Sequence, residues 1–234
     1  MITIAIPTGY LLPGALRLLG GAGVADVTPE DIGRKLVLRP SDDLTLVTVR
    51  PLDVAVYVDH GSADLGIVGK DALWETERVH YELLDLAFGA CRLVMAVPEE
   101  SPLGGPDTWP PMLRVATKYL AAARRYFESQ GQEAELIKLY GSVELAPLTG
   151  LADAVVDITA TGSTLRANRL REINEVGRST ARLIANQVSL RTRGGEVQDM
   201  VGRLRQGVAG AAVNVRIWSP PRRWSAWRPR SVAR

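Results

Sequence analysis

Short apolar runs alternate with stretches of helical period along most of the chain. The runs at residues 2–7, 44–49 and 65–69 are rich in Ile, Leu and Val and are bounded by Gly or Pro, which is typical of buried strands. Between the last two runs, Pro51 and Gly61 are the start and stop signals of a helix. A strand, helix, strand order predicts parallel strands joined by a right-handed crossover.

A second set of elements with the same alternation follows a stretch rich in proline. Five prolines and two glycines lie between residues 98 and 111, and such a stretch is typical of a domain boundary. Beyond it, the pattern predicts strands at 113–118, 134–140 and 154–158, a helix that Gly131 ends, and a late strand and helix between 179 and 207.

These elements predict an α/β fold of two α/β domains around a cleft, where ligands usually bind. We expect residues 1–95 plus 178–210 to form a discontinuous first domain on the nucleotide side. Residues 96–177 form the predicted second domain.

Charge is distributed unevenly along the chain. The 46% hydrophobic and 23% charged residues are ordinary for a globular protein, and the formal net charge is +2. The last twenty residues contain six arginines and no acid, so the remainder carries 2 − 6 = −4. Residues 211–234 are predicted to be a disordered basic extension, with an interaction tail for nucleic acid or an acidic partner as the alternative.

Other features exclude several classes of protein. The chain begins "MITIAIP" without the charged region of a secretory signal, and no apolar run reaches the length of a membrane span. We therefore expect a cytoplasmic protein without a membrane or nucleic-acid partner. Cys91 is the single cysteine, which excludes an internal disulfide, and His60 and His80 have no metal-ligand spacing.

The segment "VVDITATGSTL", residues 155–165, predicts an anion site. A buried strand carries its carboxyl end to the edge of the sheet where α/β proteins bind ligands. There, Gly162 permits unusual dihedral angles, and backbone N–H groups and hydroxyls can converge on a phosphate. The candidate phosphate ligands are Thr159, Ala160, Thr161, Gly162, Ser163 and Thr164. A capping turn with nothing bound is the alternative.

Two carboxylates belong to the same strand. Alternation places Asp153 and Asp157 on one face, from which both can reach the hydroxyls of a sugar attached to the phosphate. Such a pair beside a phosphosugar also suits Mg²⁺, which keeps several waters and takes few protein ligands.

Residues 144–165, "ELAPLTGLADAVVDITATGSTL", resemble the signature of the ATP phosphoribosyltransferase family, the first enzymes of histidine biosynthesis. The residues that match in spacing are Glu144, Gly150, Ala152, Val155, Asp157, Ile158, Thr161, Gly162, Thr164 and Leu165. Similar stretches occur at 50–71, 114–119, 124–127 and 180–187. The resemblance therefore covers most of the chain up to about residue 205.

This resemblance implies a fold like that of the type II periplasmic binding proteins and a defined reaction. The family joins N1 of the ATP adenine to C1 of 5-phosphoribosyl 1-diphosphate and releases pyrophosphate with Mg²⁺ as cofactor. The loop after Asp157 holds the 5-phosphate of that substrate. The predicted catalytic residues are Asp157, Lys118 and Glu144, without a dedicated protein site for the metal.

The resemblance also places ATP on the first domain, at Gly9, Tyr10, Arg50 and Asp71. The family usually has P-K-G-R at the end of the first strand, whereas this chain has "PTGY", residues 7–10. Gly9 still permits a close backbone approach, and Tyr10 can stack on a base in place of pairing with a phosphate.

Only 29 residues follow Arg205, which resembles the short form of the family, without the C-terminal regulatory domain of the long form. The short form implies a homodimer that assembles with a regulatory subunit resembling histidyl-tRNA synthetase. Two alternatives remain open: a phosphoribosyltransferase for another base, which the loop alone also fits, and a non-catalytic two-domain solute-binding protein.

Overall fold

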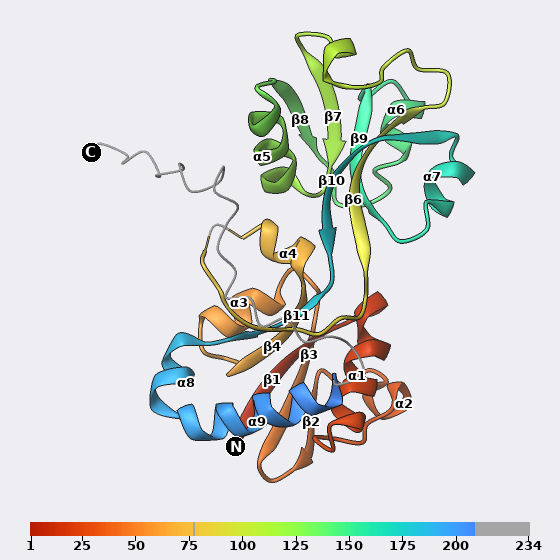
Figure 1. Ribbon diagram of the computed structural model, residues 1–234. Coiled ribbons are helices and arrows are strands. Elements are labelled where there is room, and N and C mark those ends of the chain that lie inside the picture. Colours follow the sequence, from red (N-terminus) through yellow and green to blue (C-terminus); the bar gives the residue numbers. More distant parts are fainter. Residues whose placement is uncertain (77, 209–234) are drawn as a thin grey trace.

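The computed structural model describes residues 1–76 and 78–208, which form two lobes, each built on one β-sheet (Figure 1). The predicted extension at 211–234 lies outside the described residues. Among the helices of the described ranges, none has the length and apolar character needed to cross a membrane.

The first lobe has a six-stranded sheet in the order β2-β3-β1-β4-β11-β5. Its strands are β1 (Ile2–Pro7), β2 (Val37–Ser41), β3 (Leu44–Val49), β4 (Leu65–Gly69), β5 (Tyr81–Asp85) and β11 (Ala181–Ala185). Its helices are η1 (Gly9–Leu11), α1 (Leu12–Gly21), α2 (Pro29–Ile32), α3 (Val54–Asp59), α4 (Lys70–Trp74), α8 (Gln187–Thr192) and α9 (Gly194–Gly207). The central strand β1 is parallel to β3 and β4, as the crossover pattern predicts.

The second lobe has a five-stranded sheet in the order β10-β6-β9-β7-β8. Its strands are β6 (Cys91–Pro98), β7 (Leu113–Thr117), β8 (Ala134–Lys138), β9 (Ala154–Thr159) and β10 (Leu170–Ser179). Its helices are η2 (Pro106–Thr108), α5 (Leu120–Gln130), α6 (Leu145–Leu148) and α7 (Ser163–Ala167). Here β7 is parallel to both β8 and β9, whereas β6 is antiparallel to β9 and β10.

The chain passes between the lobes twice, and the first passage differs from the sequence-based boundary at residue 95. Strand β6 pairs with β9 and β10, so all of it lies in the second sheet and the passage falls between Asp85 and Cys91. The proline-rich stretch that suggested the boundary follows β6 as a loop of the second lobe. The predicted domains, residues 1–95 plus 178–210 and residues 96–177, stay a prediction as units.

Strand alternation splits the core of each lobe between two helical layers. In the first lobe, Ile4 of β1 packs in a cluster with residues of α1 and α9, whereas its neighbour Ala5 packs with residues of α3 and α4. In the second lobe, Val156 of β9 packs with residues of α5 and Val155 packs with residues of α6 and α7. The helices therefore cover both faces of each sheet and leave the strand ends for a site.

Candidate active site

Three predicted ATP-site positions lie at one edge of the first sheet. Gly9 follows β1, Arg50 follows β3 and Asp71 follows β4, three adjacent parallel strands whose carboxyl ends meet at the same edge. The backbone N–H of Thr8 donates to the carbonyl of Val49 at 2.8 Å, which joins the first two strand ends.

Gly9 and Tyr10 begin a short helical turn at this edge. Gly9 has φ +77°, a left-handed conformation that favours glycine. The Tyr10 side chain is 68% exposed, and Arg50 is exposed as well. These side chains are therefore accessible at the sheet edge that also carries Asp71.

The phosphate loop lies at the carboxyl end of β9 in the second lobe. The backbone N–H of Gly162 donates to Thr159 Oγ1 at 2.7 Å, and Thr161 Oγ1 donates to Ser163 Oγ at 3.0 Å. Arg166 donates to the carbonyl of Thr161 at 3.0 Å. These bonds hold the turn in place, while Ala160, Thr161, Ser163 and Thr164 remain exposed.

Gly162 is required by both the conformation and the packing of the turn. Its φ is +74°, and a Cβ at this position would lie 2.7 Å from Arg166 Nη1 and 3.1 Å from Glu172 Oε1. A side chain here would therefore be strained and would displace a basic group beside the loop.

Lys118 and Asp157 form an ion pair beside this loop. Lys118 follows β7, and its Nζ lies 3.5 Å from Asp157 Oδ1. Burial raises the pKa of Asp157, the charge of Lys118 opposes the rise, and the charge of Glu144 adds to it. Lys118, Asp157 and Glu144, the three predicted catalytic residues, are thus electrostatic neighbours.

Asp153 lies elsewhere. It precedes β9, at the end of the strand opposite to the loop. Its carboxylate accepts hydrogen bonds from the Arg114 guanidinium at 2.7 Å and from the Arg114 backbone N–H at 3.0 Å. Arg114 also holds the pKa of Asp153 below its ordinary value. Alternation correctly assigns residues to a face, but it neglects the length of the strand, and the structure does not bring Asp153 to the loop.

The two strand edges meet at Tyr119, which sequence reasoning assigned no role. Tyr119 is 3% exposed, and its hydroxyl donates to Asp71 Oδ2 of the first lobe at 3.2 Å. Burial and the charges of Asp71 and Asp157 raise the pKa of Tyr119 well above its ordinary value, so the phenol stays protonated and donates. The predicted ATP edge and the predicted phosphoribosyl edge therefore face each other across one buried phenol.

Ser179 is a second residue that the sequence did not reveal. Its hydroxyl donates to Asp71 Oδ1 at 2.7 Å and accepts the Asp71 backbone N–H at 3.0 Å. Ser179 is 108 residues from Asp71, and a serine at the end of a strand carries no local signal. Tyr119 did carry one, because it closes the segment "RVATKY" that contributes to the family resemblance.

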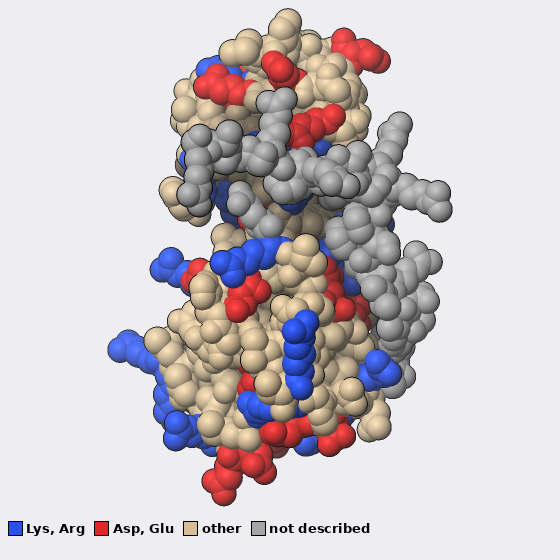
Figure 2. Space-filling view, turned by 90° about the vertical axis from the view of Figure 1, so that its left-hand side faces the viewer, with Lys and Arg blue, Asp and Glu red and all other residues tan. Residues whose placement is uncertain are grey.

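Basic and acidic side chains lie next to one another on the first lobe where it borders the second (Figure 2). Charges of both signs therefore lie at this border.

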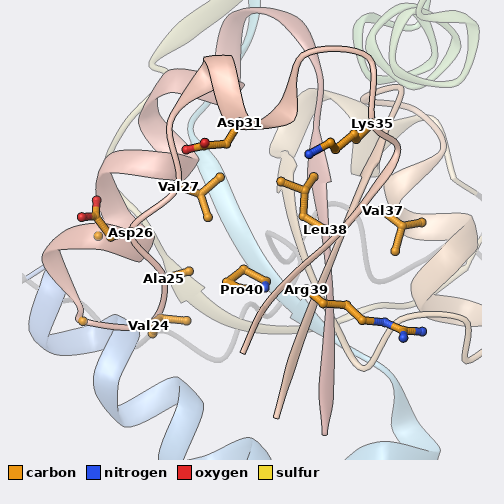
Figure 3. Close-up of a pocket in the computed structure, with 12 residues that line it drawn as sticks. Val24, Ala25, Asp26, Val27, Asp31, Lys35, Val37, Leu38, Arg39 and Pro40 are labelled. Carbon is orange, nitrogen blue, oxygen red and sulfur yellow. The ribbon is translucent and has the colours of Figure 1, made fainter. Parts of the chain in front are cut away.

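A separate hollow of about 710 Å³ lies at the far side of the first lobe (Figure 3). The loop after α1 contributes Val24, Ala25 and Val27, and β2 contributes Leu38 and Pro40. None of the predicted site residues lines it, so this hollow and the candidate chemistry lie in different places.

Comparisons with known proteins identify the family. The model of the ATP phosphoribosyltransferase family matches residues 50–206. An ATP phosphoribosyltransferase of Rubrobacter xylanophilus is 48% identical over 214 residues, which cover 89% of this chain and 99% of the relative. One from a Thermoanaerobacter species is 44% identical and covers 88% of this chain and 96% of the relative.

The chain belongs to the ATP phosphoribosyltransferase family.

Solved structures agree with this membership and with the expected fold. The ATP phosphoribosyl transferase (HisG:HisZ) complex from Thermotoga maritima contains a chain that is 34% identical, with a TM-score of 0.77 and coverage of 90% of this chain and all of that chain. The periplasmic aliphatic sulphonate binding protein SsuA of Escherichia coli is 15% identical with a TM-score of 0.58, covering 89% of this chain and 72% of that one. The second likeness shows the fold alone, and it confirms the predicted periplasmic-binding-protein-like architecture.

ATP phosphoribosyltransferases are pentosyltransferases of histidine biosynthesis, and phosphoribosyl transfer generally requires a divalent metal ion. Within residues 1–76 and 78–208, no group of three or more His, Cys, Asp or Glu side chains is placed to hold a metal. Asp157 and Glu144 still supply carboxylate oxygens of the kind that a hard divalent cation prefers. The chemistry of these two side chains therefore fits a hard divalent cation.

Proposed function

We propose that this chain is the short-form catalytic subunit of ATP phosphoribosyltransferase and that the edges meeting at Tyr119 are its active site. The reaction forms a bond between N1 of the ATP adenine and C1 of the ribose of 5-phosphoribosyl 1-diphosphate, and pyrophosphate leaves from C1. The observation that carries the site assignment is the contact between Asp71 and Tyr119, which joins the two substrate edges.

The second lobe binds phosphoribosyl diphosphate in this proposal. The loop Thr159–Thr164 holds the 5-phosphate through backbone N–H groups and hydroxyls. Asp157 lies at the start of that loop and accepts hydrogen bonds from the ribose hydroxyls. Lys118, paired with Asp157 at 3.5 Å, is placed to contact the diphosphate. Asp153 is omitted because Arg114 occupies its carboxylate.

The first lobe binds ATP at the edge that carries Gly9, Tyr10, Arg50 and Asp71. The exposed Tyr10 ring offers a face on which adenine can stack, and Arg50 pairs with phosphate oxygens. Asp71 is oriented by Ser179 and Tyr119, so its carboxylate is held at the border between the two substrates.

The chain's own chemistry is positional and electrostatic. Displacement at C1 passes through a centre with oxocarbenium character and needs no covalent nucleophile from the protein. Holding both reactants in line lowers the barrier, and the carboxylates of Asp157 and Glu144 stabilise the developing positive charge. Lys118 stabilises the negative charge on the departing diphosphate.

We further propose Mg²⁺ as the divalent ion, because it binds diphosphate oxygens, keeps several waters and needs few carboxylates. When bound, it neutralises part of the charge of the leaving pyrophosphate. Asp157 and Glu144 are the side chains that would hold it or its waters.

Assembly and location complete the proposal. The Thermotoga maritima relative is described as a complex of HisG with HisZ, which supports a regulatory partner, resembling histidyl-tRNA synthetase, for this chain as well. The match covers 99% and 96% of the two relatives described above. Because these relatives have nearly the length of the matched region, the comparison supports the short form. We propose a catalytic homodimer within that hetero-oligomer, in the cytoplasm.

The deciding experiment incubates the pure chain with ATP, phosphoribosyl diphosphate and MgCl₂. The expected product is an adduct with the mass of phosphoribosyl-ATP, formed with one equivalent of pyrophosphate and detected by mass spectrometry and absorbance. Omission of either substrate must abolish it. Addition of the regulatory subunit should accelerate the reaction.

The same assay distinguishes the alternatives. Turnover of orotate or a purine base in preference to ATP would assign the chain to another phosphoribosyltransferase. Tight binding of an anion without turnover in the presence of the partner would favour a solute-binding protein.

A further inference from the structure

Glu75, the residue that follows α4 of the first lobe, caps a helix of the second lobe. Its Oε1 accepts the backbone N–H of Ala122 at 2.9 Å, and its Oε2 accepts the backbone N–H of Ala121 at 3.1 Å. These amides belong to the first turn of α5, whose N–H groups have no partner within the helix. The carboxylate also lies at the positive end of the helix dipole.

A cap usually comes from the residue just before the helix. In α5 that residue is Tyr119, which makes no side-chain capping bond and directs its hydroxyl to Asp71 instead. The cap therefore comes from 46 residues away and from the opposite lobe. The capping hydrogen bonds of α5, which a local residue could supply, therefore connect the two lobes.

Three further contacts fix α4 against the second lobe. The Arg125 guanidinium, on the next turn of α5, donates to the carbonyl of Trp74. The Trp74 ring packs over Gly177 of β10, where an added Cβ would lie 2.7 Å from the indole. Asp71, in the first turn of α4, accepts the Tyr119 hydroxyl. Residues 71–75 thus contact both the start of α5 and the strand β10.

The residues just before α5 are those of the proposed site. Lys118 pairs with Asp157 and Tyr119 contacts Asp71, so the position of the first turn of α5 determines the spacing between the two substrate edges. An in-line displacement requires the reacting atoms to be about 3–3.5 Å apart, and a misplacement of about 1 Å can reduce the rate a hundredfold.

We propose that Glu75 is a positioning residue for phosphoribosyl transfer, which holds α5 from the opposite lobe and so sets the spacing between ATP and phosphoribosyl diphosphate. This inference rests on the proposed function of the site. Glu75 contacts the two backbone amides and neither substrate.

The test compares the full-length wild type with Glu75→Ala, Glu75→Gln and the matched control Glu133→Gln, an exposed acid beyond the end of α5. Each substrate alone is titrated by calorimetry, and turnover is measured with both. In Glu75→Ala, we expect kcat to fall by at least about tenfold while the Kd of each substrate alone stays within about twofold, because the change acts on their relative placement. Glu75→Gln keeps one acceptor oxygen and should recover part of the rate, and Glu133→Gln should match the wild type.

A second readout is hydrogen exchange at the amides of Ala121 and Ala122. Both should exchange faster in Glu75→Ala than in the wild type, because their acceptor is removed. If Glu75→Ala does not fold, Glu75→Gln carries both measurements, with partial loss of rate and protection expected.

The inference is overturned if kcat is unchanged in Glu75→Ala, or in Glu75→Gln where Glu75→Ala does not fold. It is also overturned if substrate binding weakens in proportion to the loss of rate, because that result indicates a purely structural role. Failure of the proposed function gives a different result. In that case the wild type itself forms no phosphoribosyl-ATP, while exchange at the two amides still depends on Glu75.

Discussion

Lys118 Nζ lies 3.5 Å from Asp157 Oδ1, at the carboxyl ends of the adjacent parallel strands β7 and β9. Asp157 is largely shielded from solvent, and burial raises its pKa despite the neighbouring cation. The pair therefore places a carboxylate whose charge is costly in the folded protein beside a cation that only partly offsets this cost.

The Lys118→Met variant should raise the pKa of Asp157 further. The ammonium favours the carboxylate form, so its removal leaves burial and the charge of Glu144 opposed only by the hydrogen bond from the Ile158 backbone N–H. Carbon-13 NMR titration of the aspartate carboxyls measures the change. The control is Lys138→Met, which removes a lysine of β8 that contacts Tyr140 and should leave the titration of Asp157 unaltered. A lower pKa in Lys118→Met would contradict the proposed electrostatics.

The Asp157→Asn variant should be more stable than the wild type at pH 8 and lose that advantage towards pH 4. The folded-state pKa of Asp157 is above its ordinary value of 3.8. Below 3.8 both states are protonated; as the pH rises, the unfolded chain ionises first, and the folded protein loses stability until the raised folded pKa has been passed. At pH 8 we expect the free energy of unfolding of the variant to exceed that of the wild type by about 1 kcal/mol, as is found when active-site strain is removed. The corresponding rise in Tm is about 2–4 °C.

Thermal unfolding followed by circular dichroism at both pH values checks this expectation. The same variant should lose transferase activity. A gain in stability that is independent of pH would show that the carboxylate charge is not its source.

The variants Gly162→Ala and Gly150→Ala should separate backbone strain from damage to the phosphate loop. Both glycines have positive φ, at +74° and +72°, so each substitution should reduce the free energy of unfolding by about 1 kcal/mol. A Cβ at Gly150 meets nothing within 4 Å, whereas a Cβ at Gly162 meets Arg166. Only Gly162→Ala should therefore raise the KM for phosphoribosyl diphosphate, and steady-state kinetics with denaturant unfolding measures both effects. Equal KM values for phosphoribosyl diphosphate in the two variants would show that the loop is not part of the binding site.

The Tyr119→Phe variant should weaken the contact between the lobes at Asp71. It removes the hydroxyl that donates to Asp71 Oδ2 at 3.2 Å and leaves a carboxylate with one partner fewer. We expect a loss of stability of about 1.5–3 kcal/mol, because the acceptor is charged, together with a higher KM for ATP. The control Tyr126→Phe changes a tyrosine within α5, which packs against Trp109 and Phe127. If both variants have the same KM for ATP as the wild type, Asp71 is not part of the ATP edge.

The sequence predicts the site where its parts are local. Three local features could be recognised: strand β9, the turn at Gly162 and the lysine after β7. Hydrophobic alternation, a glycine and a strand end are all features of neighbouring residues. Asp153 shows the limit of this reasoning, since alternation gives the face of a strand but not the partner at its far end. Tyr119, Ser179 and Glu75 act on groups 46–108 residues away, and no local pattern specifies such contacts.

Fold class could be predicted for the same reason, whereas the assignment of β6 to the second sheet depends on more than a local signal. The proline-rich stretch after β6 is a strong local signal for a loop, and its position within the second lobe depends on the pairing of β6 with β9 and β10. That pairing is a property of distant strands.

The chain enters and leaves the second sheet at a single point, because Cys91 at the start of β6 is the direct antiparallel partner of Ser179 at the end of β10. Their Cα atoms are about 4.5–5.5 Å apart, as in any such pair, and a two-residue hairpin turn bridges that distance. In topological terms, residues 91–179 are an insertion within a continuous six-stranded sheet. Genetic excision of this insertion therefore leaves one junction, and its exchange between relatives needs two junctions that lie side by side, neither of which alters the order of the strands in the first sheet.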